Sequence, residues 1–125
     1  MTDRELIERA ALAIGLGVTW EPVHNCHWIS LDQGIPVYPW EPLNDDAEAF
    51  RLSVKLDIQH GRDGNVYWAR WDGSSEVYRE EVGVNRVADP FAATRRAIVR
   101  AAAARSIHLG IAQRDGLADF PVSAC

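Results

Sequence analysis

The chain has 125 residues, of which 47% are hydrophobic and 25% charged; this balance is typical of one folded domain and excludes an intrinsically disordered chain. Its net charge of −5 argues against a strongly basic nucleic-acid-binding surface. No apolar run approaches the ~18 residues of a membrane-spanning helix, so no membrane partner is expected. Cys26 and Cys125 are too few for a disulfide framework, and the acidic residues near the start are unlike a secretion signal. We therefore expect free thiols in the cytoplasm.

The first predicted element is a helix at the N-terminus. Thr2 is followed three residues later by Glu5, the spacing of a capping box in which each residue's side chain bonds to the other's backbone. Apolar residues then share one helical face: Leu6, Ile7, Ala10, Ala13 and Ile14. Gly15 and Gly17 mark the end of the helix, because glycine readily adopts the left-handed backbone of a helix terminus.

The region up to the second helix has weaker strand signals. Residues 28–31 predict a short strand, and residues 35–38 predict an edge strand, because Pro36 and Pro39 cannot donate to a sheet. Asn44 is the predicted N-cap of a second helix that runs to Leu56. Apolar residues cover more than half of its circumference, which predicts a helix buried between other elements. These residues are Ala47, Ala49, Phe50, Leu52, Val54 and Leu56.

A β-meander is predicted after this helix. Residues 57–60, 66–71 and 76–82 have strand composition and are separated by turns rich in Gly, Asp, Asn and Ser. The middle strand has apolar residues on both faces, so we expect both faces of the sheet to be covered. The predicted fold class is α+β, an antiparallel meander of three to four strands sandwiched between helices (an α-β-α sandwich).

A third helix is predicted from Asp89 and Pro90, which have the types preferred at the N-cap and the first helical position. It runs to about Leu109. Its many alanines predict close approach of a neighbour, and a second copy of the chain is one candidate. Residues 114–125 predict a loop-like tail, so the whole chain, 1–125, is expected to form a single domain.

Two segments resemble a known family: PWEPLNDDAEAFRL at 39–52 and DPFAATRRAIVRAAA at 89–103. The first is similar to the W-x-P-L-x-D-D-x-x-A-x-R-L stretch of the phage ABA-sandwich domain family, which includes the NinX-type bacteriophage proteins. Phe50 stands where a smaller residue is expected, and residues 21–32 match nothing in the family. The resemblance implies a sandwich fold and a phage or prophage origin, hence the cytoplasm of a bacterial host cell. It implies no activity and no catalytic residues.

Several residues are predicted to be structural anchors. Trp40 beside Pro42 is expected to be a rigid buried anchor before the second helix, with ligand stacking as the alternative. Arg95 falls on the apolar face of the third helix, where a cation needs a partner. We predict an ion pair with Asp45, Asp46 or Glu48; a phosphate or acidic-ligand site is the alternative.

His24, Cys26 and His27 are the candidate residues for a metal or catalytic site. Zinc needs three or four ligands, and His60, His108 and Cys125 could supply the others only without any paired spacing. Cys26 and His24 could also form a nucleophile pair, but nothing indicates an oxyanion site or a group that orients the base. We therefore predict no metal, cofactor or catalytic set, and the three residues remain an alternative.

Two opposite surface interpretations remain open. Arg96 and Arg100 are expected side by side on the solvent face of the third helix, with Arg86 before it, and could contact phosphates of a nucleic acid. Conversely, six acidic residues could form a surface that imitates DNA: Asp45, Asp46, Glu48, Glu76, Glu80 and Glu81.

The sequence thus favours a non-enzymatic function. The absence of an assembled catalytic set, the five tryptophans and the family resemblance predict a small bacteriophage or prophage accessory protein. It is expected to bind a macromolecular partner, an unknown phage or host protein. The alternatives are a small metal-dependent or Cys/His enzyme that uses His24, Cys26 and His27, and a nucleic-acid binder that uses Arg96 and Arg100.

Overall fold

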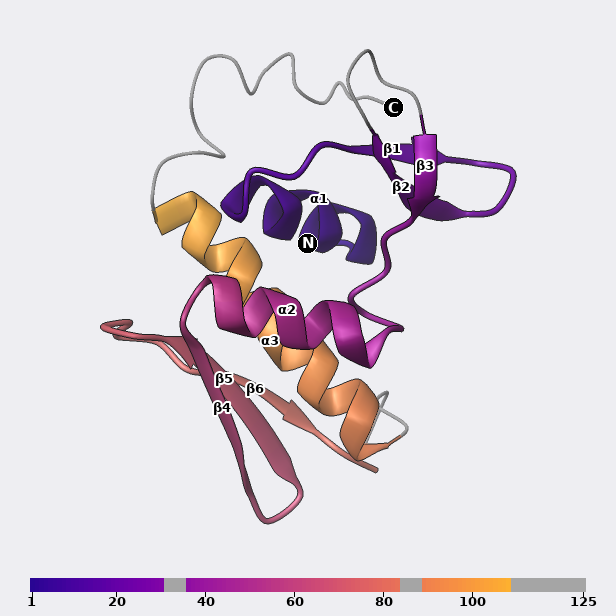
Figure 1. Cartoon of the computed structure of the whole chain (residues 1–125). Coiled ribbons are helices and arrows are strands. Elements are labelled where there is room, and N and C mark those ends of the chain that lie inside the picture. The colour runs from indigo at the N-terminus through magenta and orange to yellow at the C-terminus, as the bar shows by residue number, and fades with distance from the viewer. Residues whose placement is uncertain (31–35, 84–88, 109–125) are drawn as a thin grey trace.

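A computed structural model describes residues 1–30, 36–83 and 89–108 of the chain (Figure 1). Two antiparallel sheets have the strand orders β1-β2-β3 and β4-β5-β6. Along the chain the elements are α1 (Asp3–Ala13), β1 (Val18–Glu21), β2 (Cys26–Ser30), β3 (Pro36–Pro39), α2 (Asp46–Lys55), β4 (Ile58–Asp63), β5 (Val66–Trp71), β6 (Tyr78–Glu81) and α3 (Pro90–His108).

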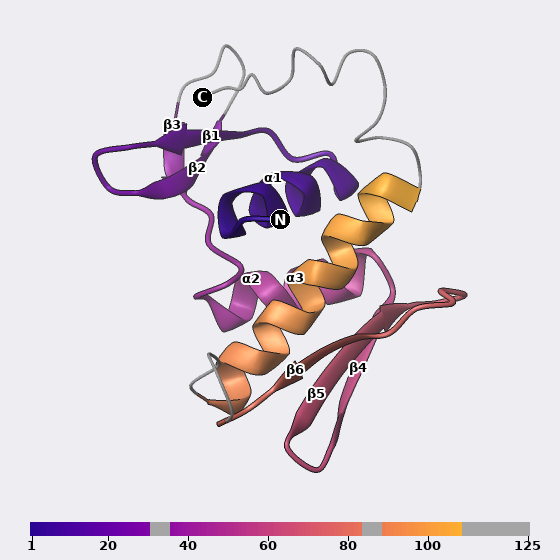
Figure 2. The ribbon, with the colours of Figure 1, turned by 180° about the vertical axis from the view of Figure 1, so that it is seen from behind.

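The three helices lie between the two sheets. α3 crosses one face of the β4–β6 sheet, and α1 and α2 both pack against α3 (Figures 1 and 2). The first sheet lies beside α1, away from the second sheet. The main hydrophobic core fills the space among the helices and the inner face of the second sheet. The predicted α+β class, with a three-stranded meander packed by helices, is confirmed.

Both ends of α1 agree with the sequence prediction. The Thr2 hydroxyl accepts from the Glu5 N–H at 3.1 Å, and Glu5 Oε1 accepts from the Thr2 N–H at 3.1 Å, so the capping box is complete. At the other end Gly15 has a φ of 70°, and the Leu16 N–H donates to the Ala11 carbonyl at 2.9 Å. This is the bond of a Schellman motif, which stops the helix.

α3 begins as predicted and uses its alanines for packing. Asp89 Oδ1 accepts from the Ala92 N–H at 2.7 Å, and Pro90 is the first helical residue. α1 packs along this helix, and five alanines of α3 are almost fully buried: Ala93, Ala97, Ala101, Ala102 and Ala103. The predicted close neighbour is therefore present within the chain, and these alanines are not available to a second copy.

Two predictions about α2 are wrong. Its N-cap is Asp45 and not Asn44, since Asp45 Oδ1 accepts from the Ala47 N–H at 2.9 Å. The helix is also not buried all round, because Phe50 is 62% exposed and Val54 is 59% exposed. Among the described elements α2 packs mainly against α3 and β4, so one apolar stripe is enough to cover its inner side. Apolar width alone could not show which of the two stripes would be buried.

The meander has nearly the predicted strands. β4 continues to Asp63, three residues beyond the prediction, and pairs with β5 through a tight hairpin in which Gly64 has a φ of 63°. On the outer face, Gly61 faces Trp68, and a Cβ atom at position 61 would lie 2.7 Å from the Trp68 ring. The glycine therefore makes room for the indole, and this contact half-buries Trp68 on a face that no described helix covers. The expectation that both faces of the sheet are covered is therefore not met by the described helices.

The first sheet was only partly predicted. β2 covers most of the strand expected at 28–31, and β3 pairs with β2 as the expected edge strand. β1 was not predicted, because its four residues are too short to display a reliable alternation. Residues 31–35, including the start of the second predicted strand, lie outside the described part of the chain.

Candidate interaction surface

The candidate metal or catalytic residues are separated in the structure. His24 lies in an exposed turn, where its ring contacts Glu21, whereas His27 is 1% exposed and its Nε2 lies 2.9 Å from Glu8 Oε2. Burial raises the pKa of the Cys26 thiol, which disfavours the thiolate needed for nucleophilic attack or metal binding. Among residues 1–30, 36–83 and 89–108, no three His, Cys, Asp or Glu side chains are grouped to hold a metal ion. Cys125 lies outside these residues.

His27 instead connects the first sheet to α1. Glu8 on α1 accepts its hydrogen bond and also pairs with Arg4 at 3.2 Å, and Arg4 stacks over the Trp20 ring at 4.6 Å. Trp20 meets the His27 ring edge-on, with a centroid distance of 5.0 Å. Desolvation lowers the pKa of His27 in spite of the nearby Glu8 carboxylate. The imidazole is therefore a neutral packing residue.

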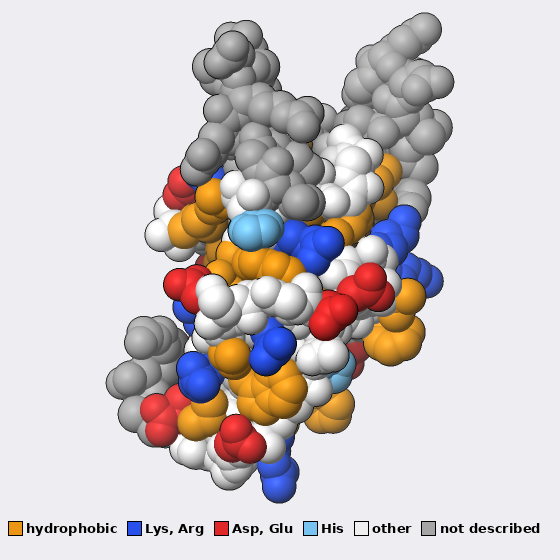
Figure 3. All heavy atoms as spheres, turned by 90° about the vertical axis from the view of Figure 1, so that its left-hand side faces the viewer, with side chains coloured by type: hydrophobic (Ala, Val, Ile, Leu, Met, Phe, Trp, Pro, Cys, Tyr) orange, Lys and Arg blue, Asp and Glu red, His pale blue; other side chains and the backbone are white. Residues whose placement is uncertain are grey.

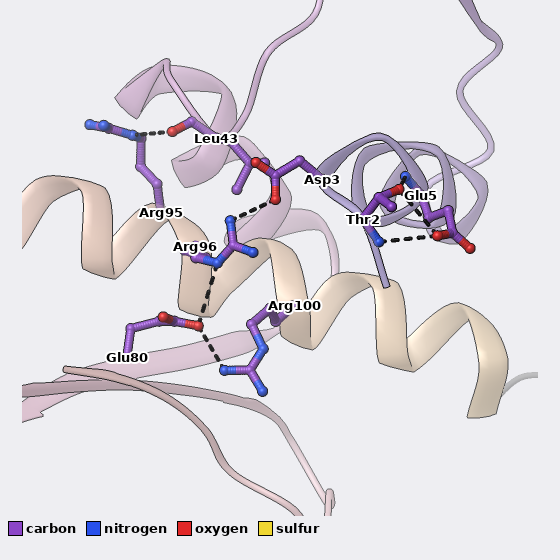
Figure 4. Close-up of polar contacts among 8 residues, drawn as sticks. All are labelled: Thr2, Asp3, Glu5, Leu43, Glu80, Arg95, Arg96 and Arg100. Atoms are coloured by element: carbon purple, nitrogen blue, oxygen red, sulfur yellow. Dashed lines mark hydrogen bonds and ion pairs between the residues drawn. The ribbon is translucent and has the colours of Figure 1, made fainter. Parts of the chain in front are cut away.

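The predicted anchors lie where α2 meets α3. Trp40 is 2% exposed and Pro42 is buried. The backbone N–H of Trp40 donates to the backbone carbonyl of His27 at 2.8 Å. Arg95 Nε donates to the Leu43 carbonyl at 2.8 Å (Figure 4). Arg95 Nη1 lies 2.7 Å from Asp46 Oδ1. The expected ion pair of Arg95 is thus present, and it joins the two segments on which the family resemblance depends.

Arg96 and Arg100 form a cluster around Glu80 of β6 (Figure 4). Arg100 Nη1 lies 2.7 Å from Glu80 Oε2, Arg96 Nε lies 3.7 Å from the same oxygen, and Arg96 Nη1 lies 2.9 Å from Asp3 Oδ1. Glu80 is only 12% exposed, and both arginines are about one third exposed. The two arginines lie side by side as expected, but both guanidinium groups already have carboxylate partners. Arg86 lies outside the described residues.

The acidic surface is also not assembled. Glu80 is enclosed by two arginines, Asp46 is bound by Arg95, and Glu48 pairs with Arg51 at 3.4 Å. In the part of the surface that the structure describes, three of the six acidic side chains therefore have arginine partners. A surface of one sign, which a nucleic-acid binder or a DNA mimic would need, is not supported there.

A groove of about 770 Å³ lies beside the arginine cluster, along one face of α3 between α1 and β6. Its wall includes the outer strand of the second sheet, and Tyr78 of this strand has a pKa raised to about 12, mainly by burial and by its hydrogen bond to Glu76. The groove is lined by both charged and apolar side chains. Its lining residues on α3 are Arg96, Arg100, Ala103, Ala104 and Ile107.

An exposed apolar stripe lies on the outer side of α2. We call it the α2 surface and define it as Ala47, Phe50 and Val54, which recur at intervals of three and four residues. All three are exposed, and the charged side chains of Arg51 and Lys55 adjoin them. In the sequence, these three residues form the second apolar stripe of the helix. Because the two stripes together cover more than half of the circumference, the second stripe was expected to be buried as well.

Comparisons with known proteins give no relative. No family model, curated protein or solved structure matches the chain. None of the helices within residues 1–30, 36–83 and 89–108 is long and apolar enough to cross a membrane. The resemblance to the phage ABA-sandwich family therefore stays a prediction, and the site must be interpreted from its geometry.

Proposed function

We propose that this chain is a small bacteriophage or prophage accessory protein that binds a macromolecular partner through the α2 surface. The observation that carries the proposal is the exposure of Phe50, 62%, and Val54, 59%, on one side of one helix. Full burial of side chains of this size contributes ~1.5–3 kcal/mol each. A partner that covers both would gain much of this energy.

The spacing of the α2 surface fits a known mode of recognition. Apolar anchors at positions i, i+3 and i+7 of a helix are those that insert into a hydrophobic groove of a partner. Phe50, in the middle of the three, is the largest anchor, and single exposed apolar residues elsewhere need no such explanation. Arg51 and Lys55 at the rim favour a groove with acidic side chains around it.

The phage part of the proposal depends on the sequence resemblance. Its two motifs belong to α2 and α3, which pack against one another through Arg95 and Asp46. This contact supports the idea that the motifs form one structural unit. Genes for phage proteins on either side of the coding sequence would support the origin, and a chromosomal setting without them would contradict it.

The binding function can be tested by capture from a lysogenic host. Tagged wild-type chain should retain a specific protein that mass spectrometry identifies, and the double variant Phe50→Asp, Val54→Asp should lose at least about 90% of it, since two charges would enter an apolar contact. Val23→Asp is the matched control, because Val23 is 83% exposed in the turn between β1 and β2. Equal capture by the double variant and by wild type would refute the role of the α2 surface.

A further inference from the structure

β6 has an unpaired edge beside the groove. It is an outer strand of its sheet and pairs only with β5 in the part of the chain that the structure describes. An unpaired strand edge presents N–H and C=O groups that can pair with another strand. This edge is separate from the α2 surface, so pairing through it is independent of the proposed function.

The register shows which backbone groups face this edge. The Val82 N–H donates to the Asn65 carbonyl of the neighbouring strand at 2.9 Å. Because successive residues of a strand direct their backbone groups to opposite sides, Glu80 also faces β5, whereas Arg79 and Glu81 face away. Arg100 Nη1 contacts the Arg79 carbonyl at 2.9 Å, as expected if this oxygen points to the free edge.

The edge is complementary to itself. If two copies of β6 lie antiparallel about a two-fold axis at Glu80, Arg79 of each copy lies opposite Glu81 of the other. These are the residues whose N–H and C=O groups face the open edge, so the pair forms four main-chain hydrogen bonds. The same register places Arg79 and Glu81 side chains on one face as two cross-strand ion pairs. A shift of this register by one residue would lose both the four main-chain hydrogen bonds and the pairing of opposite charges.

The negative charge of Glu80, the residue on the two-fold axis, is already balanced by basic side chains. Glu80 would meet its own copy, and two carboxylates directly opposite one another repel. Each Glu80, however, is held by Arg96 and Arg100 at 3.7 Å and 2.7 Å on the inner face. Two carboxylates would thus lie among four guanidinium groups, and the Arg79 carbonyl keeps a second lone pair for the partner strand.

We propose that two copies of the chain associate through antiparallel pairing of β6, which joins their second sheets into one six-stranded sheet. Figure 3 views the outer face of the second sheet, where hydrophobic side chains gather in the middle and basic and acidic side chains lie around them. Pairing at β6 makes the two outer faces continuous. The joined sheet has a closed, isologous interface, so association stops at the dimer.

The test uses charge reversal on the full chain and sedimentation equilibrium. Wild type should approach twice the chain mass as its concentration rises. Arg79→Glu places Glu opposite Glu, and Glu81→Arg places Arg opposite Arg, so each variant should associate at least about tenfold more weakly. The double variant Arg79→Glu, Glu81→Arg restores opposite charges and should dimerise again. An equimolar mixture of the two single variants should form a heterodimer.

Arg79 and Glu81 are exposed, so the variants should fold, which circular dichroism checks. The control pair is Arg62→Glu and Asp63→Arg on β4, the other outer strand, and it should leave the dimer unchanged. A wild-type mass that stays monomeric at every concentration would overturn the proposal. So would a dimer that persists equally in both single variants, because the copies would then meet elsewhere.

Discussion

His27 and Glu8 show how this protein uses polar side chains in its interior. A histidine beside a cysteine and another histidine is a plausible metal ligand in a sequence, but a ligand set depends on side-chain directions that spacing does not give. Here His27 points into the protein toward Glu8 on α1, while His24 lies in an exposed turn. The contact spans 19 positions, so no local pattern could have predicted it.

We predict that His27 makes the fold sensitive to mild acid. Its folded pKa lies below the value of about 6.5 expected when unfolded, so the unfolded chain binds the extra proton first. Stability is therefore complete above about pH 6.5 and falls as pH decreases toward the folded pKa, by at most about 1.4 kcal/mol per pH unit. Urea unfolding of wild type and His27→Gln at several pH values measures this slope.

The His27→Gln variant should be less stable than wild type at neutral pH, but its free energy of unfolding should decrease less than that of wild type as the pH is lowered. Glu5 and Glu21, whose pKa values are lowered from 4.5, titrate below this window and do not confuse the comparison. The groups that face His27, namely Glu8, Arg4 and Glu41, are retained in the variant. Parallel pH profiles for the two proteins would show that His27 is not the group responsible.

At the scale of the element, local signals predicted starts and stops well. The caps of α1 and α3 depend on side chains within three residues of the helix end, so Thr2, Glu5 and Asp89 could be recognised from sequence. At α2 three candidates follow one another, and residue preference alone favours Asn44 as much as Asp45. The structure decides between them because Asn44 closes a turn with Glu41 and only Asp45 reaches the helical N–H groups.

The corrected N-cap of α2 gives a matched pair of variants. Asp45→Ala removes the acceptor for the Ala47 and Glu48 N–H groups and should lower the free energy of unfolding by about 1 kcal/mol. Asn44→Ala removes only an exposed contact of 3.4 Å to Glu41 and should change it by less than about 0.5 kcal/mol. Urea unfolding followed by circular dichroism measures both; a larger loss for Asn44→Ala would make Asn44 the cap after all.

At the scale of the whole molecule, the order of the layers determines which surfaces remain free. The sequence predicted helices and a meander, but which stripe of α2 faces inward depends largely on α3, which is distant in the chain. The alanines of α3 were correctly expected to admit a close neighbour, yet that neighbour is α1. The outer side of α2 and the edge of β6 are two of the surfaces that remain free, and each has its own proposed partner.

The central claim is that Phe50 and Val54 serve binding and not folding. The most direct measurement is the free energy of unfolding of Phe50→Ser, Val54→Ser against wild type. Serine has a helix propensity close to those of phenylalanine and valine, so only burial is tested. We predict a change within about 1 kcal/mol, whereas Leu52→Ala, at a residue only 1% exposed, should lose about 2–5 kcal/mol. A loss of several kcal/mol in the serine variant would place both residues in the core and contradict the claim.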